Sequence, residues 1–165
     1  MSAKVRKLTV SFHVQPADKL ETTDAATFKQ SDGISYVNGG GCRSAADKVF
    51  QHNGFGTLKI KNFFADTFGK LYRSCGNCSG NGKPRHVTMD NIYAINPGTP
   101  GLLIGINANY GDTAVVSNSC GVKMEKACAL YEGCNNSCES PLISSGPDAG
   151  GYHCVAENIQ ETCYQ

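Results

Sequence analysis

The sequence predicts an all-β protein folded as a parallel β-helix, a solenoid in which short strands stack coil upon coil. Four segments share the pattern apolar, any residue, apolar, any residue, Asn, and they begin 24, 29 and 27 residues apart. Their period-two alternation is typical of strands with one buried face. The 19 glycines among 165 residues suit many tight turns. The four segments are Ile34–Asn38, Leu58–Asn62, Val87–Asn91 and Ala114–Asn118.

A second series of shorter strands is expected between these segments. Lys48 and Lys70 begin two of them and stand 22 residues apart, about one turn of a large solenoid. Repeats that cannot bury their own apolar face must stack on their neighbours. Stacked Asn side chains would then hydrogen-bond along the solenoid and satisfy their amides. The second series comprises Ala25–Lys29, Lys48–Gln51, Lys70–Tyr72 and Leu102–Ile106.

Other repeat architectures fit less well. The alternation and the interrupting glycines exclude helical repeats, and the leucine-rich pattern is missing. A β-sandwich stays open, because its strands are also short and bounded by turns, although it does not require Asn at matched positions.

The chain is expected to form one structural domain with three parts. Residues 1–22 form a divergent N-terminal segment, residues 23–119 the β-helix core, and residues 120–165 a Cys-rich cap at the C-terminal end. Six cysteines fall in the last part, and six cysteines allow 15 pairings, so their connectivity is not deducible.

Nine cysteines in 165 residues favour structural disulfides in an exported protein. Secretion is therefore predicted, although the basic start of the chain is not followed by an apolar segment of signal-peptide length. Cys75-Gly76-Asn77-Cys78 could also suit redox or zinc chemistry, but each of these needs a context that the sequence does not offer. The odd ninth cysteine is interpreted as one whose partner lies outside this chain.

Net charge excludes some partners. The formal charge is +1, so no global field favours nucleic acid or a membrane surface, and no stretch is apolar enough to span a membrane. Attraction to a polyanion must therefore come from a local cluster of basic residues.

Such a cluster is predicted at Lys48, Lys70 and Arg73. If the repeat is right, Lys48 and Lys70 lie one rung apart, about 4.8 Å along the solenoid. Two ammonium groups so close lower at least one pKa, and a lysine so altered can act as a base near neutral pH. Arg73 can bind a carboxylate with two parallel hydrogen bonds. The alternative is a solvated basic face, and Arg73 joins the cluster only if the chain turns after Lys70.

Residues 24–112 resemble the pectate lyases of polysaccharide lyase family 3. The matching pieces lie in the right order and cover about half of the chain: Asp24–Lys29, Gly39–Gly41, Asp47–Gly54, Phe68–Cys78, Arg85–Val87 and Gly105–Asp112. The resemblance implies a right-handed, single-stranded parallel β-helix of the pectin-lyase-like type. It also implies calcium-dependent eliminative cleavage of polygalacturonate, the acidic chain of plant cell-wall pectin, giving 4,5-unsaturated oligogalacturonides.

The resemblance also implies residue roles. Lys48 would be the base that removes the C5 proton, Lys70 and Arg73 would hold and polarise substrate carboxylates, and Asp24 would be a calcium ligand. Thr23 stands where the family has a Glu, and a further upstream carboxylate of the family is missing or unrecognisable. Because calcium takes six to eight oxygen ligands, this departure leaves open whether the chain is an active or an impaired lyase.

Two other functions stay open. One is a non-catalytic secreted protein that binds pectin through the basic groove, and the other is a purely structural solenoid stapled by disulfides. The family implies a monomer. An uncapped first rung would instead lower solubility or pair with a second copy, because an open strand edge offers unpaired backbone groups.

Overall fold

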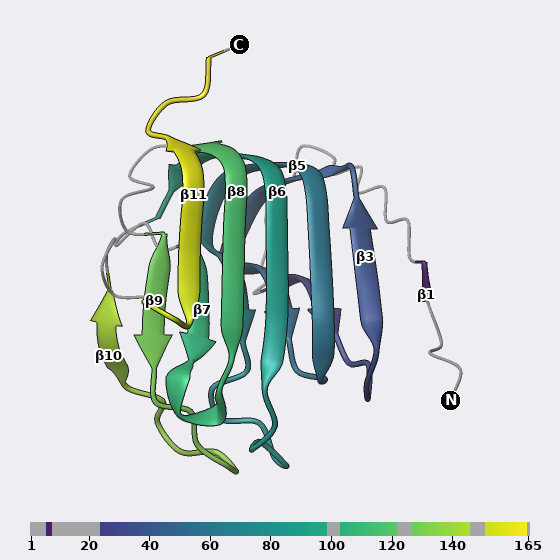
Figure 1. The fold of residues 1–165 in the computed structure, drawn as a ribbon, viewed down its shortest axis with the longest axis vertical. Coiled ribbons are helices and arrows are strands. Elements are labelled where there is room, and N and C mark those ends of the chain that lie inside the picture. The colour runs from purple at the N-terminus through teal and green to yellow at the C-terminus, as the bar shows by residue number, and fades with distance from the viewer. Residues whose placement is uncertain (1–5, 8–23, 99–102, 122–126, 146–150, 165) are drawn as a thin grey trace.

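The computed structural model describes residues 6–7, 24–98, 103–121, 127–145 and 151–164, which form a stack of strands with one short helical turn (Figure 1). The turn is a 3-10 helix at Ala108–Tyr110. The strands are β1 (Arg6–Lys7), β2 (Asp24–Phe28), β3 (Ile34–Asn38), β4 (Gly41–His52), β5 (Gly56–Ser74), β6 (Arg85–Pro97), β7 (Ile104–Asn107), β8 (Thr113–Gly121), β9 (Cys128–Tyr131), β10 (Leu142–Ser145) and β11 (Cys154–Gln160).

The coils have three faces, each a parallel sheet. Face A stacks β2, residues 48–52 of β4, residues 70–74 of β5, β7 and β9. Face B stacks β3, residues 56–61 of β5, residues 85–90 of β6, residues 113–117 of β8 and the first half of β11. Face C stacks residues 41–45 of β4, residues 63–68 of β5, residues 92–97 of β6, residues 119–121 of β8 and the end of β11.

This architecture confirms the predicted right-handed parallel β-helix. The Asn-terminated segments form face B and the second series forms face A. Face C is the part that the sequence did not reveal, because its strands follow the Asn positions without a break in β5, β6 and β8. The long strands of Figure 1 therefore bend around the solenoid rather than run straight.

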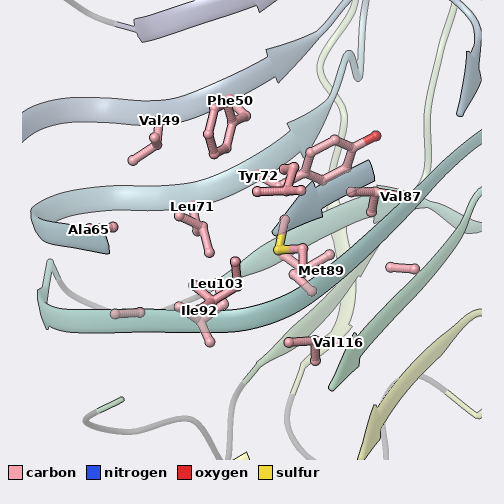
Figure 2. Packing of buried hydrophobic residues seen from close by; sticks show 14 of the residues in the cluster. Val49, Phe50, Ala65, Leu71, Tyr72, Val87, Met89, Ile92, Leu103 and Val116 are labelled. Atoms are coloured by element: carbon pink, nitrogen blue, oxygen red, sulfur yellow. The ribbon is translucent and has the colours of Figure 1, made fainter. Parts of the chain in front are cut away.

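The core is a set of apolar columns inside the coils (Figure 2). Leu58, Val87 and Ala114 are register partners on face B, and all three are buried. Ala65 and Ala94 form a similar column on face C. Each column buries the same kind of side chain in successive coils, so the stacking is stabilised by hydrophobic burial at every rung.

An asparagine ladder marks the corner between faces B and C. Asn62, Asn91, Asn118 and Asn158 all have φ between 48° and 55°, the left-handed region that Asn tolerates better than most residues. Asn62 donates to Asn38 at 3.0 Å, and Asn91 donates to Asn62 at 2.8 Å. The repeated Asn therefore turns the chain and links neighbouring coils, as the sequence predicts.

The cysteines form four disulfides, Cys75–Cys78, Cys120–Cys163, Cys128–Cys154 and Cys134–Cys138. The last three disulfides each join two cysteines within residues 120–165. In the same segment, β11 adds a further strand to the stack by pairing with β8 in parallel. The ninth cysteine is Cys42, which is buried and unpaired. It stands next to Ala65 in a core column, so it packs as a small apolar residue, and burial raises the pKa of its thiol.

At the N-terminal end, β2 pairs with β4 and with no other strand of the described residues. The expectation of an open first rung concerns residues 8–23, which lie outside the described residues. Within the described ranges, the chain has no helix with the length and apolar character needed to cross a membrane.

Candidate functional site

Three charged side chains form a row along face A. Asp24 on β2 is the register partner of Lys48 on β4, and Lys48 is the partner of Lys70 on β5. The predicted one-rung relation of the two lysines is therefore confirmed. All three side chains are partly exposed, whereas Val49, the residue after Lys48, is buried in the core.

The row begins with ion pairs around Lys48. Its Nζ lies 3.6 Å from Asp24 Oδ1 and contacts Asp47 Oδ2. Asp24 Oδ1 is buried and accepts no hydrogen bond. A buried acceptor without a hydrogen-bond donor is costly, so this oxygen is one that a cation would stabilise.

Lys70 has a lowered pKa. Burial is the largest cause, because it disfavours the charged ammonium, and the positive charges of Lys48 and Arg73 lower the pKa further. Asp47 opposes these effects and raises it. The sequence predicted the direction of the change from repulsion between lysines, but desolvation contributes more than repulsion does.

The alternation of side chains along β5 breaks between Lys70 and Arg73. Leu71 and Tyr72 are adjacent and both are buried, so the alternation of an extended strand breaks at this point. The sequence made a shared site of Lys70 and Arg73 depend on a turn of the chain, because a straight strand would send the two side chains to opposite faces. Because Arg73 lowers the pKa of Lys70, the two cations lie within electrostatic range.

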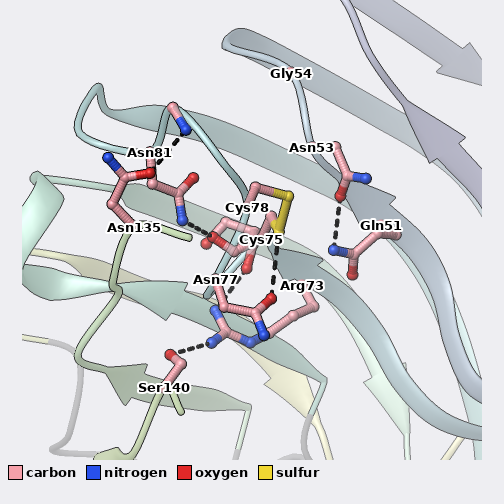
Figure 3. The surroundings of a disulfide bond; sticks show 12 residues. Gln51, Asn53, Gly54, Arg73, Cys75, Asn77, Cys78, Asn81, Asn135 and Ser140 are labelled. Atoms are coloured by element: carbon pink, nitrogen blue, oxygen red, sulfur yellow. Dashed lines mark hydrogen bonds between the residues drawn. A yellow bond between two sulfur atoms is a disulfide. The ribbon is translucent and has the colours of Figure 1, made fainter. Parts of the chain in front are cut away.

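Arg73 is held by the protein itself (Figure 3). Its Nη1 donates to Ser74 O at 2.7 Å and to Asn107 Oδ1 at 2.9 Å, and its Nη2 donates to Ser140 Oγ at 3.0 Å. The guanidinium also stacks on the ring of Tyr131, 3.9 Å from its centre, and only 7% of the residue is exposed. Burial is the main cause that lowers its pKa to about 10.

Gly105 makes this packing feasible. A Cβ at this position would lie 2.7 Å from Arg73 Cδ and 3.1 Å from the Tyr131 ring. The register places Gly105 directly beside Arg73 on the next coil, so a side chain here would displace the guanidinium. Tyr131, Ser140 and the role of Gly105 could not be identified from the sequence, because these contacts join segments that are distant along the chain.

Asp112 organises a buried network beneath Arg73. It accepts hydrogen bonds from Ser74 Oγ at 2.5 Å, from Asn107 N at 2.9 Å and from Arg85 N at 2.8 Å. Asn107 in turn donates to Ser74 Oγ and to Cys75 O. The sequence singled out residues 105–112 only as a family-like segment. The structure shows that Asn107 and Asp112 fix the loop after β7 and hold Arg73.

His52 and Arg85 occupy the same corner. Burial and the charge of Arg85 lower the pKa of His52 to about 4, so the ring is neutral at neutral pH. The ring bonds to Tyr72 Oη at 2.9 Å and to Gln30 Nε2 at 3.1 Å. Arg85 donates to the backbone oxygens of Gly54 and Asn53. Both side chains therefore have structural partners.

The described residues contain no group of three or more His, Cys, Asp or Glu side chains that could hold a metal ion. Within the described part of the row, Asp24 Oδ1 is a buried carboxylate oxygen that accepts no hydrogen bond and lies 3.6 Å from Lys48 Nζ. The oxygen suits a hard cation such as calcium, but one carboxylate is a small part of the six to eight oxygens that calcium takes.

The fold and the face A row together define a right-handed parallel β-helix protein with stacked cationic side chains on one sheet. A family model described as "Pectate lyase" matches residues 21–138, which is well over half of the 165 residues. The chain belongs to the pectate lyase family.

Several fungal relatives support this assignment. A probable pectate lyase D of Emericella nidulans is 48% identical over 126 residues, which are 75% of this chain and 47% of the relative. A probable pectate lyase F of Aspergillus terreus is 45% identical over 122 residues, 73% of this chain and 50% of the relative. The chain thus spans about half the length of the curated relatives that it matches.

Solved structures agree with the fold. The catalytic domain of pectate lyase PelI from Erwinia chrysanthemi has a TM-score of 0.67 at 29% identity, covering 82% of this chain and 67% of that one. PelI from the same organism in complex with tetragalacturonic acid has a TM-score of 0.65 at 32% identity, covering 81% of this chain and 48% of that one.

Proposed function

We propose that this chain cleaves polygalacturonate by β-elimination at face A. The single observation that carries the proposal is the register pairing of Lys48 with Lys70, which presents two ammonium groups on neighbouring coils of a pectate lyase fold. A polyuronate carries one carboxylate on each sugar, so stacked cations are the complementary surface. The complex of PelI with tetragalacturonic acid supports this substrate class.

The reaction needs a base and a charge partner for the uronate. A basic side chain takes the proton from C5, the C4–O bond breaks, and the electron pair of the C5–H bond forms the C4=C5 double bond. The departing oxygen takes a proton from water. We assign the base to Lys48, following the family match, and the electrostatic stabilisation of the carboxylate to Lys70. Arg73 contributes through its positive charge rather than through direct hydrogen bonds to the substrate, because its Nη atoms already donate to the protein.

Asp24 is the residue proposed to hold calcium. Its buried Oδ1 has no hydrogen-bond donor and so fits an oxygen ligand of the ion. Calcium would neutralise the uronate carboxylate and so acidify the C5 proton. Lys48 lies 3.6 Å from the same oxygen, so it and a cation would be neighbours at Asp24.

The site of action is proposed to be extracellular. Four disulfides occur in the described residues, and disulfides of this number persist in oxidising environments. The proposed substrate, the pectin of plant cell walls, is itself extracellular.

A matched pair of variants tests the assignment. Lys48→Arg and Lys70→Arg each keep a positive charge, but arginine cannot act as a base because it stays protonated. We expect Lys48→Arg to lower kcat about 100-fold or more, as loss of general base catalysis does. Lys70→Arg should mainly raise KM. The measurement is the ultraviolet absorbance of the unsaturated product formed from polygalacturonate.

The controls decide between catalysis and binding alone. Activity should rise with added calcium, fall with chelator, and fall again in Asp24→Asn. No absorbance gain with calcium in the unaltered protein would contradict the lyase proposal. Binding to polygalacturonate that Lys70→Ala weakens, without any product, would then identify a non-catalytic pectin-binding protein.

A further inference from the structure

A small concavity lies on the side of the solenoid away from the lysine row, at the corner between faces B and C. Its volume is about 150 Å³, and its lining includes Asn91, Tyr93, Asn118, Asn158 and Gln160. Pockets for drug-sized ligands have volumes of about 300 to 1,000 Å³. A concavity of this smaller volume therefore suits a single small unit of a larger ligand. It shares no residue with the face A site.

The lining carries unused hydrogen-bonding groups because the asparagine ladder is interrupted here. Asn118 donates to Asp90 Oδ1 at 2.9 Å, whereas Asn91 donates to Asn62. Within the described part of the chain, no hydrogen bond joins Asn91 to Asn118. The amide oxygen of Asn91 and that of Asn158 accept no side-chain bond there, so both can receive a donor from a ligand.

An exposed tyrosine accompanies these amides. Tyr93 lines the concavity and is 41% exposed. Tyrosine offers a flat apolar face and a polar hydroxyl group. It therefore suits a ligand with one apolar side and one side that stays in contact with water.

The chemistry of the lining selects the ligand class. All its side chains are uncharged, which disfavours a uronate or another ion as the ligand. The nearby Asp90 is engaged by Lys61 at 3.1 Å, so its charge is already balanced. Amides that both donate and accept match sugar hydroxyls, which also do both, and the face of the Tyr93 ring matches the C–H side of a sugar ring.

We propose that this concavity is a second glycan site, which binds one uncharged sugar unit of a polysaccharide. The site would anchor the protein on neutral chains while face A engages the acidic chain. It does not depend on the lyase proposal, because the two surfaces lie on different faces and share no residue.

Affinity electrophoresis tests the site directly. The full chain is run in native gels that contain galactan, arabinan or hydroxyethylcellulose, each an uncharged polysaccharide, and in a gel without polysaccharide. At least one of these polymers should retard the protein. Tyr93→Ala should weaken that retardation about fivefold to tenfold, since aromatic contacts contribute about 1 kcal/mol and 1.4 kcal/mol is tenfold.

Two control variants make the result decisive. Tyr152 is 86% exposed and does not line the concavity, so Tyr152→Ala should keep full retardation. Lys70→Ala should lose affinity for polygalacturonate and keep its affinity for the neutral polymer. No retardation by any of the three polymers, or retardation that Tyr93→Ala leaves unchanged, would overturn the proposal.

Discussion

Two corners of the solenoid each contain an aspartate that accepts three hydrogen bonds, but they stabilise the coils in different ways. At the corner between faces B and C, Asp90 accepts from Lys61, Ser117 and Asn118 on neighbouring coils and is partly exposed. At the corner between faces A and B, Asp112 is fully buried. At the exposed corner an asparagine amide recurs from coil to coil, whereas the hydrogen-bond network at the buried corner occurs only once.

This difference indicates where the stability of the functional face resides. Arg73 is fixed by Asn107 and Ser140, and Asn107 by Asp112, so the cationic face depends on the buried corner. The ladder at the exposed corner shapes the turn, and water can replace its bonds. Buried polar networks lose much more when one member is removed than exposed ones do.

The largest expected effect is that of Asp112→Ala. Removing this carboxylate leaves Ser74, Asn107 and Arg85 without their buried acceptor, so unfolding free energy should fall by about 3–5 kcal/mol. Asp90→Ala is the matched control, since it also removes an acceptor of three bonds but at a partly exposed position. Urea unfolding measures both. Similar losses in the two variants would contradict the distinction between the corners.

Acid should affect the buried corner first. In the unfolded chain His52 becomes protonated near pH 6.5, whereas in the folded protein its pKa is lowered to about 4. Stability therefore falls as the pH drops through this window, by up to about 3 kcal/mol at pH 4 and below. Hydrogen bonds from Asn118, Lys61 and Ser117 lower the pKa of Asp90, so the exposed corner loses stability only as the pH falls below 3.8.

Unfolding by urea at pH 7, 5.5 and 4 separates the two corners. His52→Gln should lower stability at pH 7 and flatten its dependence on pH between 6.5 and 4. Asp90→Asn should leave that part of the profile unchanged. A profile that His52→Gln does not flatten would show that the buried imidazole is not the group that titrates.

The contrast also explains how far the sequence could be interpreted. Faces A and B and the asparagine corner come from a repeated pattern, so a single chain contains several copies of the signal. The register of Lys48 with Lys70 follows from the same repeat. Face C was missed because in β5, β6 and β8 its strands continue from the Asn turns without a separating Gly or Pro, as in Phe63–Phe68.

The surroundings of Arg73 could not be inferred in that way. Tyr131 and Ser140 lie 58 and 67 residues further along the chain, and they meet Arg73 only once the C-terminal segment has folded onto face A. A contact that occurs once has no periodic signature. The pairing of the last six cysteines was undetermined for the same reason, whereas the need for disulfides followed from their number alone.

The smallest effect concerns the exposed ladder and asks what its asparagines contribute. Asn62 has φ of 55°, and it bonds to Asn38 and Asn91. Asn62→Gly removes both side-chain bonds but keeps the left-handed turn accessible, whereas Asn62→Ala also strains the backbone. Because alanine in this region costs about 1–2 kcal/mol, Asn62→Ala should be the less stable variant by about 1 kcal/mol in urea unfolding. Equal losses would mean that the amide bonds, rather than the turn conformation, are what the repeated Asn supplies at the corner between faces B and C.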